Sequence, residues 1–297
     1  MDNLPQNRAT IDEDENFGPL LRFLYTKKKG QRHLRVIAAP WFSKLGGIYL
    51  NSSISKNKIK RFVKRNNIDL SDYPKRDYTS FNDFFTRSII PSKRPFNENI
   101  DKLPAPCDGK LTVFHLEENK SFIIKGCDYT LDTLLRNDAL AAEYRGGWGL
   151  LFRLSIDDYH RYCYPVSGEK TENTHIDGVY HTVRPTAAAS RAIYKENTRE
   201  YTQIYSNEFG NILMMEVGAM LVGKITNLNG AGIAVRGNEK GYFEFGGSSI
   251  IILTEPGRFK PDEDILTNSE LGKETIVKMG EAIGTSISEK QKNPETE

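Results

Sequence analysis

The apolar positions near the N-terminus have the spacing of a helix. Four of them recur at the i, i+3, i+4 and i+7 positions that share one helix face: Phe17, Leu20, Leu21 and Leu24. Apolar residues continue over positions 34–48, where Pro40 is expected to start or break a helix because it lacks a backbone N–H. The pattern predicts that residues 17–100 form a helical arm and a connector.

A second, shorter helix is predicted after Ser80. Ser80 can cap the first turn, and Asp83 lies three residues further on, as in a capping box. The aromatic residues of this stretch share a face: Phe81, Phe84 and Phe85. We expect that face to be anchored in the core.

From Leu103 onward, short runs of strand-forming residues alternate with glycine turns. The predicted strands cover residues 110–116, 121–124, 149–156, 213–217, 221–228 and 249–253. One helix is predicted over 131–144 from the spacing of its leucines. The fold class is therefore α+β, with a mainly antiparallel β body over 101–287 and an N-terminal helical arm. Polar, mobile tails are expected at 1–16 and 288–297.

Composition narrows the class of protein. The chain has 297 residues, of which 38% are hydrophobic and 27% charged, so it can build a sizeable core. A net charge of only +2 argues against a dedicated nucleic-acid binder. Cys107, Cys127 and Cys163 are odd in number and form no CxxC pair, so neither a disulfide framework nor a metal site is expected. A reducing compartment fits this cysteine usage, and we expect no signal peptide.

The charge of the predicted arm is strongly one-sided. Residues 16–68 contain no Asp or Glu. Basic residues recur throughout the same stretch: Arg22, Lys27, Lys28, Lys29, Arg32, Arg35, Lys44, Lys56, Lys58, Lys60, Arg61, Lys64 and Arg65. Cations beside an apolar, aromatic face suit an anionic membrane surface. The alternative is an arm packed on the body with a solvated basic face, and the two are compatible.

The candidate chemistry lies where a Gly-Ser turn enters an apolar run. Gly246, Gly247, Ser248 and Ser249 precede Ile250-Ile-Ile-Leu253, which has the length and β-branching of a buried strand. The first serine after such a turn is a candidate nucleophile. The alternative is a glycine bulge that opens an ordinary core strand.

Two further segments hold titratable groups. Asp108, in Cys107-Asp-Gly109, precedes a strand, where an Asp-Gly pair most often forms a turn. The segment 157–165 combines carboxylate, phenol, imidazole, guanidinium and thiol groups at a strand end. Such a density of titratable groups is typical of functional sites.

Together these stretches resemble the bacterial phosphatidylserine decarboxylase proenzymes, from about Trp41 to Gly284. The shared landmarks occur in the family's order: Phe81-Asn-Asp-Phe-Phe-Thr-Arg87, Arg94-Pro95, Cys107-Asp-Gly109, Lys125-Gly126, Asp158-Tyr-His-Arg161, Glu208-Phe-Gly210, Val217-Gly-Ala219, Val222-Gly223, Lys240-Gly241, Phe243 and Gly246-Gly-Ser248. The chain is similar to the compact subgroup with Gly-Gly-Ser at the cleavage site.

The resemblance implies self-cleavage between Gly247 and Ser248, which converts Ser248 into a covalent pyruvoyl cofactor. That group would bind phosphatidylserine as a Schiff base and yield phosphatidylethanolamine and CO2, with no metal. The large and small chains of one precursor would form a heterodimer, and a homodimer is left open. The resemblance also implies a peripheral protein on the cytoplasmic side of the cell membrane, with no nucleic-acid partner.

The resemblance leaves the base for self-cleavage open. It implies an Asp-His-Ser group in which Asp108 matches the aspartate. The sequence also places the Ser249 hydroxyl where it could donate a supporting hydrogen bond nearby. Relatives commonly carry two histidines in Asp-Tyr-His-Arg-x-His, whereas this chain has His160 and then Cys163. Three hypotheses follow: His160 takes both roles, His181 moves in from a neighbouring strand, or Cys163 acts itself. We favour His160, because a thiol needs a lowered pKa to act.

Other functions were weighed against this one. A pyruvoyl decarboxylase for another amino-acid substrate, or a lipid-binding homologue that never cleaves, would share the fold. A serine hydrolase is disfavoured because no Gly-x-Ser-x-Gly motif surrounds Ser248.

Overall fold

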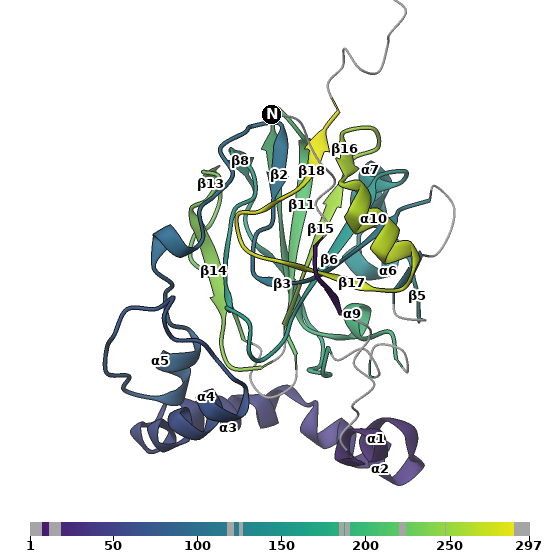
Figure 1. Cartoon of the computed structure of the whole chain (residues 1–297). Coiled ribbons are helices and arrows are strands. Elements are labelled where there is room, and N and C mark those ends of the chain that lie inside the picture. The colour runs from purple at the N-terminus through teal and green to yellow at the C-terminus, as the bar shows by residue number, and fades with distance from the viewer. Residues whose placement is uncertain are drawn as a thin grey trace, which may run out of the picture.

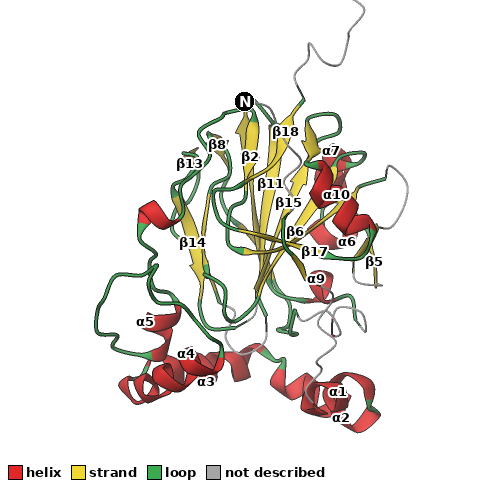
Figure 2. Cartoon of the chain, in the orientation of Figure 1, coloured by secondary structure: helices red, strands yellow, loops and turns green. Residues whose placement is uncertain are grey.

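A computed structural model provides the fold. It describes residues 8–11, 19–117, 122–124, 127–183, 187, 191–219, 224–246 and 248–287. Within them, a body of β-sheets carries a row of helices along one end (Figure 1), and Figure 2 shows how strands and helices separate into these two regions. The described helices are all too short or too polar to cross a membrane. Most of both predicted tails, and Gly247, lie outside the described residues.

The helices of the arm follow one another closely, whereas those of the body are scattered between strands. The arm contains α1 (Pro19–Thr26), α2 (Lys28–Ile37), α3 (Pro40–Asn51), the 3₁₀ helix η1 (Ser53–Lys58) and α4 (Ile59–Arg65). The others are α5 (Phe81–Phe85), η2 (Pro91–Lys93), α6 (Leu131–Leu135), α7 (Asp138–Tyr144), α9 (Ile193–Glu196) and α10 (Glu263–Glu270).

The strands are short except at the centre of the body. They are β1 (Thr10–Ile11), β2 (Lys102–Pro104), β3 (Gly109–His115), β4 (Phe122–Ile124), β5 (Cys127–Tyr129), β6 (Trp148–Leu154), β7 (Arg161–Cys163), β8 (Gly168–Lys170), β9 (Thr174–Ile176), β10 (Arg199–Ser206), β11 (Gly210–Val217), β12 (Ile225–Asn227), β13 (Gly232–Ala234), β14 (Glu239–Phe243), β15 (Ser248–Thr254), β16 (Phe259–Pro261), β17 (Glu274–Val277) and β18 (Ala282–Ser286).

One large antiparallel sheet organises the body. Its order is β1-β17-β3-β6-β15-β11-β10-β8-β13, and β9 also pairs with β10. Two three-stranded antiparallel sheets, β12-β14-β7 and β16-β18-β2, contribute to the core on one face. Helices α6, α7 and α9 pack on the other face. The antiparallel sheets and the mixture of strands and helices confirm the expected mixed fold.

The central strand β15 is buried on both faces, which explains its unbroken apolar run. Ile250 and Ile252 belong to the core cluster beneath the small sheets, whereas Ile251 and Leu253 belong to the cluster beneath the helices. Successive side chains of a strand point to opposite faces, so a strand covered on both sides has no solvent-facing positions.

Most predicted strands are confirmed, with shifted ends. The stretch predicted over 221–228 is a strand only at Ile225–Asn227, and 221–223 lie outside the described residues. Strand β10 was not predicted, because the charged Arg199 occupies one of its buried positions and interrupts the apolar pattern of a strand. The Arg199 Nε donates to the Leu134 carbonyl at 2.8 Å, so a helix end satisfies a charge that interrupts the apolar pattern.

The single helix predicted over 131–144 is wrong: the chain forms two. Arg136 ends α6 in a left-handed conformation with φ of 50°. Asn137 then caps α7, because its Oδ1 accepts a hydrogen bond from the Leu140 N–H at 3.1 Å. An asparagine that can cap a new helix offers the backbone an alternative to continuing the first.

The arm only partly matches the predicted helix face. Helix α1 begins at Pro19, so Phe17 lies outside it and outside the described residues. Leu24 is buried, whereas Leu20 is 68% exposed. Pro40 is the first residue of α3, as expected for a residue without a backbone N–H.

Candidate active site

Ser248 is the first residue of β15 and is fully buried. Strand β15 lies between β6 and β11, and Ser248 pairs with Leu154 of β6. Neither the Oγ of Ser248 nor that of Ser249 has a hydrogen-bond partner among the described residues. A buried hydroxyl without a partner carries a desolvation cost, so it is a candidate for a chemical role. Gly246, two residues earlier, has a backbone φ of +152°, a conformation that residues with a Cβ rarely adopt.

Helix α5 holds the loop that leads into Ser248. The Asn82 Oδ1 accepts from the Phe245 N–H at 3.0 Å, and the Asn82 Nδ2 donates to Glu244 Oε2 at 2.9 Å. The Phe245 ring packs edge-on against Phe81 and Phe85, with centroids 4.9 and 5.0 Å away. The loop before the serine is therefore fixed by a helix about 160 residues earlier in the chain.

Asn82 was missed as a site residue, although it lies inside the stretch predicted to be a capped helix. The predicted cap exists, since Ser80 Oγ accepts from the Asp83 N–H at 3.1 Å. The reciprocal half of the capping box is absent among the described contacts, because Asp83 accepts from the Thr79 N–H at 2.8 Å instead. An asparagine between two buried aromatics was the available signal for a polar role.

His160 is buried and has one ring nitrogen free. Its Nδ1 lies 2.9 Å from the Asp158 carbonyl oxygen. Its ring packs on that of Phe85, with the two ring centroids 4.2 Å apart. A carbonyl can only accept, so Nδ1 carries the proton of the neutral ring and Nε2 carries the lone pair. Nε2 has no hydrogen-bond partner among the described residues.

The environment keeps His160 neutral and places it beside the Ser248 loop. Burial lowers the pKa of His160 to about 3, although the Asp158 carbonyl partly opposes this shift. The Gly246 backbone lies close enough to the ring to raise this pKa as well. The Phe243 N–H donates to the His160 carbonyl at 2.9 Å. His160 is thus a neutral base next to the segment that ends at Ser248.

A buried ion pair orders the turn that carries His160. The Asp158 Oδ2 accepts from Lys110 Nζ at 2.6 Å and from the Ser155 N–H at 2.7 Å. This turn fixes the Asp158 carbonyl that sets the histidine tautomer. Lys110 was not a predicted site residue, although it directly follows the Asp-Gly pair.

Asp108 does not contact His160; cations and a backbone N–H surround its carboxylate. Arg94 donates through Nε and Nη2 at 2.8 and 2.7 Å, and the Met279 N–H donates at 2.9 Å. The Lys278 Nζ lies at 3.3 Å. Burial alone would raise the pKa of Asp108, but the Arg94 hydrogen bonds and the neighbouring charges leave this pKa lowered.

Cys163 lies near Asp108 and not in the His160 environment. Its Sγ is 3.4 Å from the Sδ of Met279, whose N–H donates to Asp108. The Cys163 N–H donates to the Pro106 carbonyl at 2.9 Å. Burial raises the pKa of the thiol to about 12, so Cys163 is protonated and poorly suited to act as a base.

His181 joins the arm to the body. Its Nδ1 lies 3.3 Å from the Tyr25 hydroxyl of α1, and its Nε2 lies 3.2 Å from Glu196 Oε2 of α9. Both ring nitrogens therefore already have partners. Of the three hypotheses for the base, the geometry favours His160, since only this imidazole combines a free nitrogen with the Ser248 loop.

A buried serine entered through a glycine turn, beside a neutral histidine, defines a nucleophilic or self-processing serine site. Sequence comparison identifies which kind. The profile of the phosphatidylserine decarboxylase family matches residues 81–285, about two thirds of the chain. This chain therefore belongs to the phosphatidylserine decarboxylase family.

Individual relatives agree over nearly the full length. The chain is 43% identical over 265 residues to phosphatidylserine decarboxylase proenzyme 2 of Clostridium acetobutylicum, covering 89% of this chain and 91% of the relative. It is 38% identical over 291 residues to the Clostridium botulinum (strain Kyoto / Type A2) proenzyme, covering 94% and 98%. The Clostridium tetani proenzyme is 39% identical over 276 residues, covering 91% and 93%.

Proposed function

We propose that this chain is a proenzyme that cleaves its own Gly247–Ser248 bond and then decarboxylates phosphatidylserine to phosphatidylethanolamine and CO2. The observation that carries the proposal is the buried, unpartnered Ser248 Oγ at the start of β15, with the free Nε2 of His160 beside the preceding loop. Membership of the decarboxylase family supplies the reaction class.

Self-cleavage requires a nucleophile, a base and an ester that can be eliminated. His160 Nε2 takes the proton of Ser248 Oγ, the oxygen attacks the Gly247 carbonyl carbon, and the acyl group moves from nitrogen to oxygen. The proton passes to the freed nitrogen of residue 248. Loss of the α-proton of residue 248 then expels the Gly247 carboxylate, and hydrolysis with release of ammonia leaves the pyruvoyl group.

The surroundings of position 248 fit that group. The position is fully buried, and its strand partner Leu154 is buried as well, so bulk water is kept away. When formed, the pyruvoyl ketone supplies an electrophile for the substrate amine and an acceptor for the electrons released with CO2. His160, beside the Gly246 backbone, can hold or deliver a proton at Nε2.

A test of the proposal is the intact mass of the purified protein together with product analysis. We expect two chains, the smaller beginning at residue 248 with an N-terminus blocked as pyruvoyl, which remain associated as a heterodimer. Incubation with phosphatidylserine should yield phosphatidylethanolamine. A single full-length chain that binds lipid would instead identify a non-cleaving lipid-binding protein.

We further propose that the arm, α1 to α4, binds an anionic membrane surface and places the protein peripherally on the cytoplasmic side of the cell membrane. The helices lie in a row along one end of the body (Figure 1). They expose large apolar side chains beside their many cations: Leu20, Phe23, Val36, Trp41, Leu45, Ile48, Tyr49 and Ile54. An exposed apolar face flanked by lysine and arginine suits the interface of an anionic bilayer.

Vesicle binding tests the arm. The triple variant Lys27→Gln, Lys28→Gln, Lys29→Gln is expected to bind anionic vesicles roughly a hundredfold more weakly, because each lysine near an anionic surface contributes about 1 kcal/mol. Pelleting with phosphatidylserine-containing vesicles measures the change. Lys260→Gln, which removes an exposed lysine of the body, is the control. Equal binding of the wild type to neutral and anionic vesicles, unaffected by salt, would contradict the electrostatic part.

A further inference from the structure

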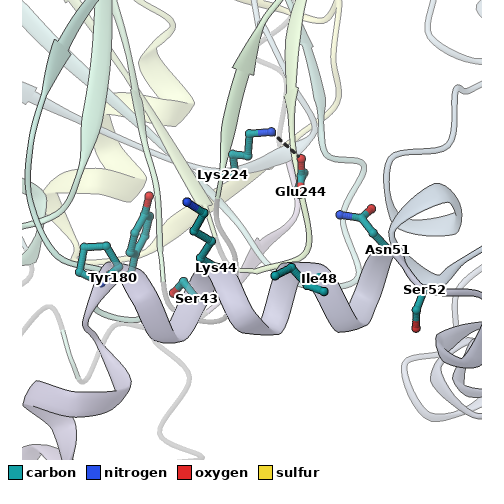
Figure 3. Close-up of a pocket in the computed structure, with 10 residues that line it drawn as sticks. Ser43, Lys44, Ile48, Asn51, Ser52, Tyr180, Lys224 and Glu244 are labelled. Carbon is teal, nitrogen blue, oxygen red and sulfur yellow. Dashed lines mark hydrogen bonds and ion pairs between the residues drawn. The ribbon is translucent and has the colours of Figure 1, made fainter.

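A pocket separates helix α3 from the body beside the loop that leads into Ser248. Its volume is about 680 Å³, which is within the usual range for a small-molecule site. Ser43, Lys44 and Ile48 line it from α3, and Tyr180, Lys224 and Glu244 line it from the body. Figure 3 shows these side chains converging from the two sides.

The pocket has an excess of positive charge. Lys44 extends from α3 toward the strands (Figure 3) and forms no ion pair among the described residues. Lys224 forms an ion pair with Glu244 at 3.2 Å, and this carboxylate also accepts from Asn82. Among the described residues that line the pocket, two ammonium groups therefore face a single carboxylate, which leaves a net positive charge suited to an anion.

An unsatisfied donor lies in the same wall. Ser43 is 5% exposed, and its Oγ has no hydrogen-bond partner among the described residues. A buried hydroxyl that lines a cationic pocket can donate to an oxygen of a bound anion. This observation is independent of the lysines, because it concerns a neutral group on the inner side of α3.

The position of the pocket connects the reactive residue to the apolar surface of the arm. Glu244 is four residues before Ser248 in the chain, and Asn82 holds the loop between them. On the other side, Ile48 lines the pocket and is 66% exposed on α3. A ligand in the pocket can therefore reach the Ser248 loop at one end and the exposed apolar residues of α3 at the other.

We infer that this pocket binds the phosphodiester of the lipid head group, with Lys44 and Lys224 as cationic ligands and the Ser43 hydroxyl as a donor. The inference rests on the proposed function. The serine end of the head group then points toward residue 248, and the acyl chains leave the pocket past Ile48. Lys44 contributes most, because Glu244 already neutralises part of the charge of Lys224.

The test uses the processed enzyme and a short-chain phosphatidylserine below its critical micelle concentration, so that membrane binding does not contribute. Lys44→Ala is expected to raise KM roughly tenfold with kcat little changed, the effect of losing one charge-assisted contact. Lys44→Arg should restore most of the affinity. Lys260→Ala, which removes an exposed lysine of the body outside the pocket, should leave KM unchanged.

Competition identifies the group that binds. Glycerophosphoserine should inhibit the wild type and should inhibit Lys44→Ala much more weakly, whereas free serine should inhibit both equally. Inorganic phosphate that competes as well as glycerophosphoserine would assign the pocket to free phosphate and overturn the lipid assignment.

Failure of the inference can be told apart from failure of the proposed function. An unchanged KM in Lys44→Ala, with an active wild type, overturns the phosphodiester site alone. A wild type that neither cleaves itself nor releases phosphatidylethanolamine overturns the proposed function, and the inference with it.

Discussion

Ser248→Ala is expected to remain a single full-length chain and to form no phosphatidylethanolamine. The variant lacks both the nucleophile for self-cleavage and the leaving oxygen whose elimination leads to the pyruvoyl group, so the two losses occur together. Denaturing electrophoresis and intact mass report cleavage, and product analysis reports activity. Efficient cleavage of this variant would show that another residue is the nucleophile.

The loss should not come from misfolding. Ser248 Oγ has no hydrogen-bond partner among the described residues, so its removal leaves no buried partner unsatisfied. We therefore expect the thermal unfolding midpoint of Ser248→Ala to stay at or above that of the uncleaved wild type. Ser249→Ala is the matched control. Ser249 points to the opposite face of β15, so this variant should still cleave, although more slowly if its hydroxyl supports the reaction.

His160→Gln is expected to slow self-cleavage by at least roughly a hundredfold, the usual contribution of a general base. Glutamine keeps a polar amide at the position of Nε2 and fills most of the same volume, but its amide nitrogen is not basic. The rate is measured from the time course of chain cleavage after synthesis. Wild-type cleavage should be nearly independent of pH between about 5 and 8, because His160, with its pKa lowered to about 3, stays neutral there.

Cys163→Ser tests the hypothesis that Cys163, and not His160, is this base. Cys163 is buried against Met279 and its thiol is protonated at neutral pH, so the serine variant should cleave at nearly the wild-type rate. If Cys163→Ser blocks cleavage while His160→Gln does not, the assignment of His160 as the base is wrong.

The lowered pKa of His160 also determines how stability depends on pH. The unfolded chain binds a proton on this histidine below about pH 6.5, whereas the folded chain does not until the pH nears 3. The contribution of His160 to stability is therefore complete above about pH 6.5 and decreases as the pH falls toward 3. In His160→Gln this part of the pH dependence should be absent.

Local sequence signals predicted much of the fold. The run Ile250–Leu253 predicted the central strand, and Pro40 marked the start of α3. Prediction failed at β10, where a polar side chain is satisfied by a distant partner. Arg199 is buried in β10 because carbonyls at the end of α6 accept its hydrogen bonds, and no pattern within β10 indicates those carbonyls.

The residues of the candidate site also fall into those that local sequence predicted and those that only tertiary contacts place. A Gly-Gly-Ser turn before an apolar run predicted Ser248 as a candidate nucleophile, and the family resemblance implied that it is the cleavage site. The resemblance also grouped Asp108 with a histidine. The described contacts instead pair Asp108 with Arg94 and Met279, whose positions follow from the packing of separate elements.

The sequence alone therefore predicted Ser248 as the candidate nucleophile, because a glycine turn that enters a buried strand is a local feature of about ten residues. The contacts that favour His160 over His181 and Cys163 are visible only in the tertiary structure. Each of these side chains lies near a segment far away in the chain: His160 beside the Gly246 loop, His181 against Tyr25, and Cys163 against Met279. Such contacts depend on the order of strands in the sheets and on the docking of the arm, which no local pattern of residues encodes.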